Sequence, residues 1–236
     1  MNDTEDDGNQ GLVIYTAAEI QSIGLDIVGY KQNRIQRAKP ETNRYRFRVH
    51  FGSDPKVIAT IFADLQTTTV AAAFIPPGNS RNIRHFLMAM HFLKVYPTEI
   101  QREATFDVSP AWGRDWCWYF IEKVQALKVS KIVWPEDNGG NDIWILSVDG
   151  IHCWTNEYIH PIWSKNSKIF SHKYSHAGLC YELGILLAKD QVCSMKGAYD
   201  AGANDITNFT RPNGLKEKLV SVGKKGVGDA AYNGHY

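Results

Sequence analysis

The stretch IWILSVDG, residues 143–150, decides the fold class of this chain. Its apolar, β-branched and aromatic residues end at Asp149 and Gly150, which is typical of a buried strand with a carboxylate at its C-terminal end. The segments that follow have strand and helix patterns of their own. We expect strands at 175–187, 191–198 and 226–229, and short helices at 205–209 and 213–220. Residues 143–236 therefore predict an α/β domain.

The region before this stretch, residues 16–133, has a helical pattern instead. Asp54-Pro55 opens one helix, apolar residues recur at helical spacing from Ile83 to Leu93, and Ser109-Pro110 opens another helix. The helix that follows Ser109-Pro110 is expected to bury most of its aromatic and aliphatic side chains. They are Trp112, Trp116, Tyr119, Phe120, Val124 and Leu127.

The polar, glycine-rich segment 134–142 begins with Trp-Pro and is the expected linker between the two regions. Residues 1–15 are expected to form an acidic, disordered tail. The whole chain is therefore expected to be an α+β protein, with a helical part followed by an α/β part.

Two neighbouring helices in the first region, at 98–104 and from Ser109 onward, have the outline of a helix-turn-helix. The second of them would present Arg114, Asp115 and Trp118 to DNA. This face is poor in basic residues, so simple packing of a helix pair is the other interpretation.

Composition excludes several classes of protein. The 236 residues are 44% hydrophobic and 22% charged, as in ordinary globular domains, and no run of apolar residues is long enough for a transmembrane helix. The acidic N-terminus does not resemble a secretory signal. Four widely spaced cysteines without a CxxC motif indicate buried thiols in a reducing compartment, with neither disulfides nor a zinc knuckle.

The net charge of +1 hides two basic stretches. Residues 29–50 carry seven lysines and arginines against Glu41 alone, and residues 163–176 carry three lysines, two histidines and no acid. Interleaved aromatic residues make both stretches typical of contact with a nucleic-acid backbone, although a solvated basic face has the same pattern. The side chains expected to contact DNA are Arg44, Arg46, Arg48, Lys165, Lys168 and Lys173.

Two aspartates, Asp149 and Asp229, occupy matching places, each after a short apolar segment and before a small residue. Aspartates at the ends of adjacent strands can hold Mg²⁺, and a pair of such ions assists phosphoryl transfer. The same pattern also fits two turn residues without a metal. The sequence has no GxSxG elbow, phosphate loop or HExxH helix, and the adjacent His152 and Cys153 would point to opposite faces of a strand.

Six segments, in order, carry a resemblance to a known family. They are SVDGIHC, HPIW, SHKYSHAGLCYELGI, GAYDAGANDITNF, GLKEKL and GVGDAAYNG. Their order resembles the DDE superfamily nucleases of PIF/Harbinger-type transposases, which have a strand ending in Asp-Gly, a basic segment, a glycine turn with an aspartate, and a GD-x-x-Tyr strand. The helical region upstream is similar too, so the resemblance covers roughly residues 80–236.

This resemblance implies an RNase H-like fold in which a carboxylate triad binds two Mg²⁺ or Mn²⁺ ions. Such enzymes hydrolyse DNA at the ends of an element and join the freed 3′-hydroxyl to target DNA. Asp149 matches the first catalytic and metal-binding aspartate, and Asp229 matches the second. Asp205 matches an aspartate of the turn motif, where a structural role behind the metal ligands is expected, and Lys173 is expected to contact phosphate.

The chain departs from the family pattern at the third acid. That glutamate lies well beyond the GD motif in the family, whereas this chain ends at Tyr236, and neither Glu157 nor Glu182 lies in the matching place. We therefore expect a C-terminally truncated copy with an incomplete RNase H-like domain, no catalysis, and exposed apolar surface on one face of the sheet.

The leading interpretation is a nuclear DDE transposase or endonuclease by descent, inactive as given because the third acid is missing. Its expected partners are DNA and a separate DNA-binding protein of the same element. The alternative is a transposon-derived DNA-binding or interaction protein without catalysis. A third interpretation is an α+β protein with neither role. No membrane contact is expected.

Overall fold

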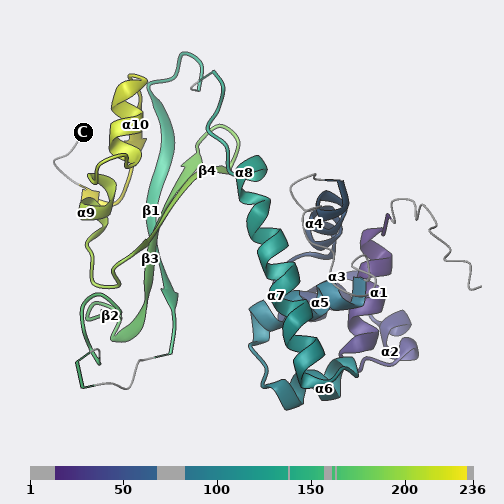
Figure 1. Cartoon of the computed structure of the whole chain (residues 1–236). Coiled ribbons are helices and arrows are strands. Elements are labelled where there is room, and N and C mark those ends of the chain that lie inside the picture. The colour runs from purple at the N-terminus through teal and green to yellow at the C-terminus, as the bar shows by residue number, and fades with distance from the viewer. Residues whose placement is uncertain (1–13, 68–82, 138, 157–160, 163, 233–236) are drawn as a thin grey trace, which may run out of the picture. The chain divides into compact units, whose positions relative to one another are not determined.

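The computed structural model describes residues 14–67, 83–137, 139–156, 161–162 and 164–232. The chain divides into two compact units, Met1–Lys128 and Val129–Tyr236. The first unit is helical and the second is built around a β-sheet (Figure 1). The expected α+β class is confirmed.

The first unit contains seven described helices, and residues 68–82 between the fourth and the fifth lie outside the described part of the chain. The helices are α1 (Ala17–Ile27), α2 (Gln32–Arg37), α3 (Pro40–Phe51), α4 (Pro55–Thr67), α5 (Ile83–Val95), α6 (Glu99–Phe106) and α7 (Pro110–Ala126). A short helix, α8 (Lys128–Lys131), crosses into the second unit. Thr16 and Thr98 each form a capping box at a helix start, and Ser109 caps α7, which satisfies backbone N–H groups that the first turn leaves free.

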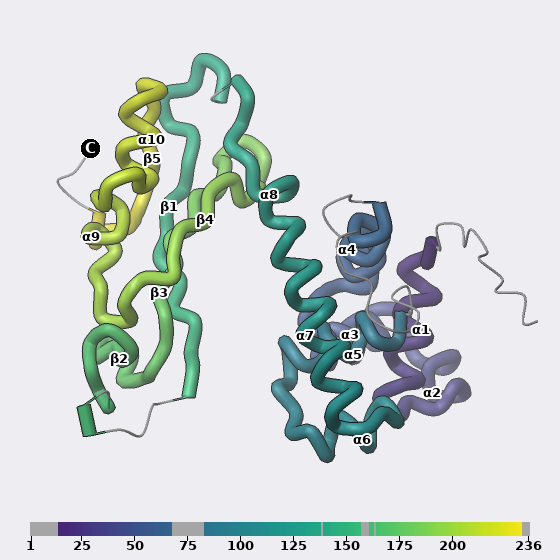
Figure 2. The backbone as a smooth tube through the Cα atoms, viewed as in Figure 1, coloured from purple at the N-terminus to yellow at the C-terminus, as the bar shows by residue number. Residues whose placement is uncertain are grey.

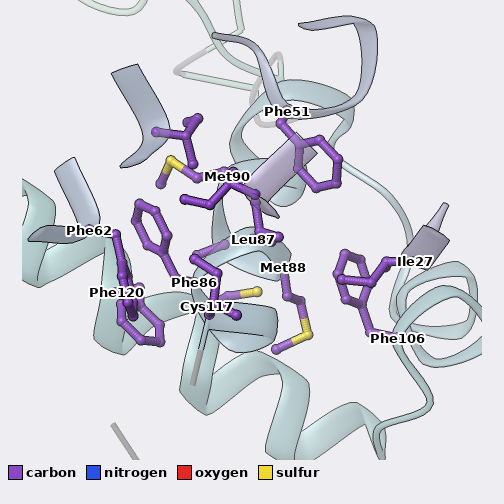
Figure 3. Close-up of a cluster of buried hydrophobic side chains, with 14 of the residues drawn as sticks. Ile27, Phe51, Phe62, Phe86, Leu87, Met88, Met90, Phe106, Cys117 and Phe120 are labelled. Carbon is purple, nitrogen blue, oxygen red and sulfur yellow. The ribbon is translucent and has the colours of Figure 1, made fainter. Parts of the chain in front are cut away.

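Helix α5 lies at the centre of the first unit's core. Its residues from Phe86 to Met90 are all buried, which places neighbouring helices on more than one side of it. Helices α1, α3, α6 and α7 all pack against α5. Figure 3 shows the resulting cluster, in which aromatic rings such as Phe62, Phe86 and Phe120 meet around the methionines of α5.

One expectation about the core of this unit was wrong. Trp116 and Phe120 of α7 are buried as predicted, but Trp112 is 42% exposed. It lies in the first turn of α7, where its ring packs edge-on against Trp116 at a centroid distance of 5.9 Å. Periodicity identified the helix, but it did not show that the first turn, which carries Trp112, lies outside the core.

The second unit is built on five strands. They are β1 (Trp144–Trp154), β2 (Phe170–Ser171), β3 (His176–Leu186), β4 (Gln191–Tyr199) and β5 (Lys225–Val227). The strands β4, β3 and β1 lie side by side in antiparallel pairs, β5 joins β1 in parallel, and β2 pairs with the start of β3. The tube in Figure 2 follows β1 and β3 along their long pairing.

Helices α9 (Asp205–Phe209) and α10 (Leu215–Ser221) lie on one side of this sheet (Figure 1), and a 3₁₀ turn, η2 (Ala230–Tyr232), follows β5. Phe209, Leu215 and Leu219 pack there against the buried side chains of β1 and β3. On the opposite side, Leu183 and Ile185 of β3 are only half buried, and Val227 of β5 is exposed. The helices at 205–209 and near 213–220 are close to their predicted positions.

The strand that decides the fold is longer than predicted. β1 does not end at Asp149 but continues to Trp154, because Gly150 to Trp154 pair with Glu182 to Gly178 of β3. Asp149 is therefore an exposed residue in the middle of a strand, and the expected strand end at Asp149 is wrong. By contrast, β5 ends at Val227, so Asp229 does lie just after its strand.

All four cysteines are free thiols, and Cys117, Cys180 and Cys193 are buried, but Cys153 is exposed. The expectation that every thiol is buried is thus wrong for Cys153. None of the helices in the described part of the chain is long and apolar enough to span a membrane.

Candidate acidic site

Two strands of the sheet bring Asp149 and Asp229 to equivalent positions. Ser147 of β1 pairs with Val227 of the parallel strand β5, and each aspartate lies two residues further along. Asp149 continues in β1 at this point, whereas Asp229 lies beyond the end of β5 and follows the paired segment. Oδ1 of Asp149 accepts a hydrogen bond from the Gly150 N–H at 2.8 Å, and Oδ1 of Asp229 accepts one from the Ala231 N–H at 2.9 Å.

A third carboxylate, that of Asp205, lies on the face of β1 that Gly150 presents to α9, whereas Asp149 pairs with Leu183 and points to the other face. Asp205 is the first residue of α9, and its carboxylate occupies the space beside Gly150, where a Cβ atom would overlap it. Burial raises the pKa of Asp205, Lys173 opposes this shift, and the charges of Asp229 and Asp149 add to it. The Asp205 carboxylate therefore feels the field of both strand aspartates. We call Asp149, Asp205 and Asp229 the acidic cluster.

Lys173 is the cation closest to this cluster among those with a described ion pair. Its Nζ lies 3.9 Å from Oδ2 of Asp205 and 5.2 Å from the centre of the Tyr174 ring. The Tyr174 hydroxyl raises the pKa of Lys173, and the charges of Asp205 and Asp229 raise it further. Lys173 is therefore a charged, exposed side chain at the edge of the cluster, in keeping with its expected phosphate contact.

Beneath the cluster lies a buried glutamate that sequence reasoning had set aside. Glu182 pairs across the strands with Gly150, is 2% exposed, and neither of its carboxyl oxygens has a hydrogen-bond partner in the described part of the chain. Burial, helped by the charge of Asp205, raises its pKa to about 7. Strand alternation over YELGI would have placed Glu182 on the same face as Gly184, towards α9 and α10. Glu157 lies outside the described residues.

Tyr232 closes the cluster from η2. Its hydroxyl is buried without a partner among the residues described, and burial raises its pKa, with further contributions from Asp205 and Glu182. A phenol that stays protonated beside several carboxyl groups is a hydrogen-bond donor for them after small side-chain movements.

Within the described ranges, no three histidine, cysteine, aspartate or glutamate side chains gather closely enough to enclose a metal ion. The acidic cluster is thus a set of neighbouring carboxylates and not a closed metal cage. Mg²⁺ does not need a closed cage, because it uses one or two carboxylates and completes its shell with water and phosphate oxygens.

The predicted DNA-binding arginines of α3 do not act as one group. Arg44 forms an ion pair with Asp54, whereas Arg46 stacks over the Tyr30 ring at 5.0 Å and donates to Asn43 at 3.1 Å. Arg48 is exposed. Residues two positions apart lie on different sides of a helix, so Arg44 and Arg48 share a face that Arg46 does not.

The predicted lysines of the second unit lie in the turns on either side of β2. Lys165 and Lys168 are exposed in the turns before β2, and the carbonyl of Lys168 accepts the Ala201 N–H at 3.1 Å. This bond ties the basic turn to the segment that leads into α9 and Asp205. The structure therefore connects Lys168 and Lys173 to the acidic cluster through short stretches of backbone.

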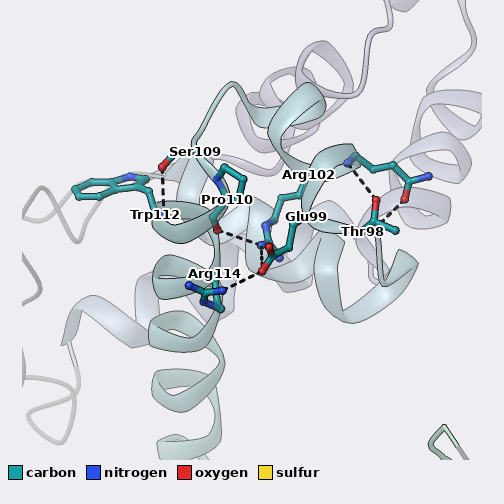
Figure 4. A network of polar contacts seen from close by, with 8 residues as sticks. Thr98, Glu99, Arg102, Ser109, Pro110, Trp112 and Arg114 are labelled. Atoms are coloured by element: carbon teal, nitrogen blue, oxygen red, sulfur yellow. Dashed lines mark hydrogen bonds and ion pairs between the residues drawn. The ribbon is translucent and has the colours of Figure 1, made fainter.

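The helix pair α6–α7 is held by a polar network (Figure 4). Arg114 pairs with Glu99 at 3.2 Å, and the buried Arg102 donates to the Pro110 carbonyl at 3.4 Å. The exposed face of α7 therefore has its arginine already neutralised by an acid of α6.

Comparison with protein-family models, with curated proteins and with solved structures finds no match to this chain.

Proposed function

We propose that this protein cleaves DNA phosphodiester bonds at the acidic cluster with the help of divalent metal ions, as a DDE-type nuclease. The observation that carries the proposal is the parallel register of β1 and β5, which gives Asp149 and Asp229 equivalent positions two residues beyond a paired site. The charges of both aspartates add to the raised pKa of Asp205, which supports electrostatic coupling among the three carboxylates.

The donor set fits Mg²⁺ or Mn²⁺. All three side chains of the cluster offer hard carboxylate oxygens, and the adjacent lysine is positioned for an anion and not for the metal. Bound ions at such a site polarise a phosphate oxygen and lower the pKa of a coordinated water.

The chain's own residues have distinct roles in this proposal. The Oδ1 atoms of Asp149 and Asp229 each accept a hydrogen bond from a nearby backbone N–H group. These hydrogen bonds orient the two carboxylates. Asp205 approaches the backbone of β1 only because residue 150 has no side chain. Lys173 neutralises a phosphate that enters the cluster, and its ion pair with Asp205 keeps it there until DNA binds.

The sheet supports the RNase H-like interpretation. Three antiparallel strands lie in the order β4, β3, β1, and β5 returns to pair in parallel with β1 after the α9–α10 connection. A parallel return needs such a crossover, and this crossover also delivers Asp205 to the two strand aspartates. The cluster thus follows from the order of the elements.

DNA contact is proposed to come from exposed basic side chains, chiefly Arg48 of α3 and Lys165, Lys168 and Lys173 of the second unit. Such contacts neutralise phosphates without reading sequence. Base reading by a helix-turn-helix in α6–α7 has less support, because Arg114 is paired with Glu99. The resemblance to PIF/Harbinger-type transposases implies that the protein acts in the nucleus.

A second candidate function is DNA binding without cleavage. It is favoured by one observation, namely that no three metal-ligating side chains of the described residues enclose an ion. Under this alternative, Asp149 and Asp229 are exposed strand residues, and the basic side chains bind DNA alone.

Supercoiled plasmid incubated with Mn²⁺ separates the two functions. The proposal predicts nicking that is lost on Asp149→Asn and on Asp205→Asn. It also predicts that nicking persists in Asp190→Asn, a matched change of an exposed aspartate in the β3–β4 turn. Plasmid retardation without nicking by the unchanged chain would instead establish the second function.

A further inference from the structure

A cavity of about 270 Å³ opens beside the acidic cluster in the second unit. Asp205 belongs both to the cluster and to the wall of this cavity, and the floor includes Gly150, which directly follows Asp149. If the phosphate of a nucleotide lies at the cluster, its sugar and base can therefore reach the cavity.

The walls of the cavity are connected to one another by hydrogen bonds. The Gly202 N–H donates to the Ser167 carbonyl at 2.8 Å, and the Ala201 N–H donates to the Lys168 carbonyl at 3.1 Å. The Cys180 thiol donates to the Ala201 carbonyl at 3.4 Å, which ties the same wall to β3. Three separate segments thus hold the opening in shape before any ligand arrives, which lowers the cost of binding.

The chemistry of the lining combines a flat aromatic surface with polar groups. The His152 ring stacks on Tyr174 with centroids 5.0 Å apart and planes 28° apart, and Tyr174 remains 46% exposed. Ser167, His172 and Asn204 add hydroxyl, imidazole and amide groups. Alanine and glycine at residues 201–203 keep the remaining volume open.

We propose that this cavity receives the base of the nucleotide adjacent to the cleaved phosphate, a proposal that rests on the proposed nuclease function. An aromatic face suits any base, because every base has a π-face for stacking. Enzymes that act on a single nucleotide commonly take its base out of the duplex stack into a pocket of this kind. The preference is therefore for unpaired or easily unpaired nucleotides, and not for one sequence.

The test uses deoxyadenosine, which has a base but no phosphate, so its binding requires neither a metal ion nor a phosphate contact at the acidic cluster. Deoxyribose is the matched probe without a base. Backbone amide shifts in nuclear magnetic resonance spectra of the full chain report the site. Deoxyadenosine is expected to shift the amides of Gly150, Tyr174 and Gly202, and deoxyribose is expected to shift none of them.

Two substitutions of Tyr174 identify the stacking surface. Tyr174→Ala is expected to weaken deoxyadenosine binding about tenfold, the scale of one base–aromatic contact, and Tyr174→Leu, which keeps apolar volume against His152, should weaken it similarly. Trp144→Ala is the matched control, since Trp144 is also 46% exposed but lies at the opposite end of β1. It should leave binding unchanged.

Deoxyadenosine that shifts no cavity amide, or that binds both Tyr174 variants as tightly as the unchanged chain, would overturn the cavity assignment. Plasmid nicking in that case would leave the nuclease function standing. Conversely, nucleoside binding that depends on Tyr174, in a chain that nicks no DNA, would support the cavity as a base site and refute the nuclease function.

Discussion

Gly150 provides a direct structural test of the acidic cluster. A Cβ atom at this position would lie 3.0 Å from Cγ of Asp205 and nearer still to its Oδ1, which is closer than real Cβ contacts come. Gly150→Ala therefore forces the Asp205 carboxylate to move away from β1. Overpacking of this kind costs about 1–3 kcal/mol in the free energy of unfolding.

A double-mutant cycle with Asp205→Ala isolates the part of this cost that comes from contact between residue 150 and the Asp205 carboxylate. Without the carboxylate, the added methyl group meets no obstacle from Asp205, and alanine in place of glycine also reduces the entropy of the unfolded chain. The change at residue 150 should then be neutral or stabilising by up to about 1 kcal/mol. The coupling free energy between the two sites is therefore expected to be about 1–3 kcal/mol.

Native-state hydrogen exchange of the β1 and β3 amides measures this coupling within the second unit, so unfolding of the helical unit does not enter the result. Equal costs of Gly150→Ala with and without the Asp205 carboxylate would refute the contact. So would an unchanged exchange free energy in the single variant.

Two other predictions concern Glu182 and Arg48. The folded-state pKa of Glu182 is raised to about 7, so its contribution to stability is present below about pH 4.5 and is lost as pH rises through 7. Urea unfolding in metal-free buffer measures the effect of Glu182→Gln on the free energy of unfolding. This effect should be more stabilising at pH 8 than at pH 5 by about 2–3 kcal/mol. The exposed control Glu136→Gln should show no such pH dependence. Arg48→Ala should reduce the slope of log Kd for duplex DNA against log salt by about 0.9, because one phosphate contact is lost, and an unchanged slope would remove α3 from the interface.

The elements of the second unit followed closely from sequence pattern, but the position of Asp149 within its strand did not. The apolar run stops at Val148, and the polar residues beyond it remain in β1 because they pair with β3 on a partly solvent-exposed sheet. Local pattern reports burial of side chains and not the extent of backbone pairing. The strand end at Asp149 was therefore misplaced.

The composition of the candidate site was only partly predictable for a different reason. Asp149 and Asp229 were identified from matching local patterns. The position of the Asp205 carboxylate, however, depends on Gly150 of β1. The burial of Glu182 depends on the elements that pack over β3 after the strand has formed. These are long-range consequences of the crossover between β4 and β5. Similarly, the contact of the Arg46 guanidinium with the Tyr30 ring depends on the packing of α3 against the segment after α1, which local pattern does not report.

Binding of Mn²⁺ to the full chain, measured by electron paramagnetic resonance of the free ion, tests most directly whether the acidic cluster is one metal site. The account predicts that Asp149→Asn, Asp205→Asn and Asp229→Asn each weaken binding by about tenfold or more, since even indirect supporting groups have effects of this size. Asp190→Asn should bind as the unchanged chain does. Equal Mn²⁺ affinity in the unchanged chain and in all three cluster variants would contradict the account.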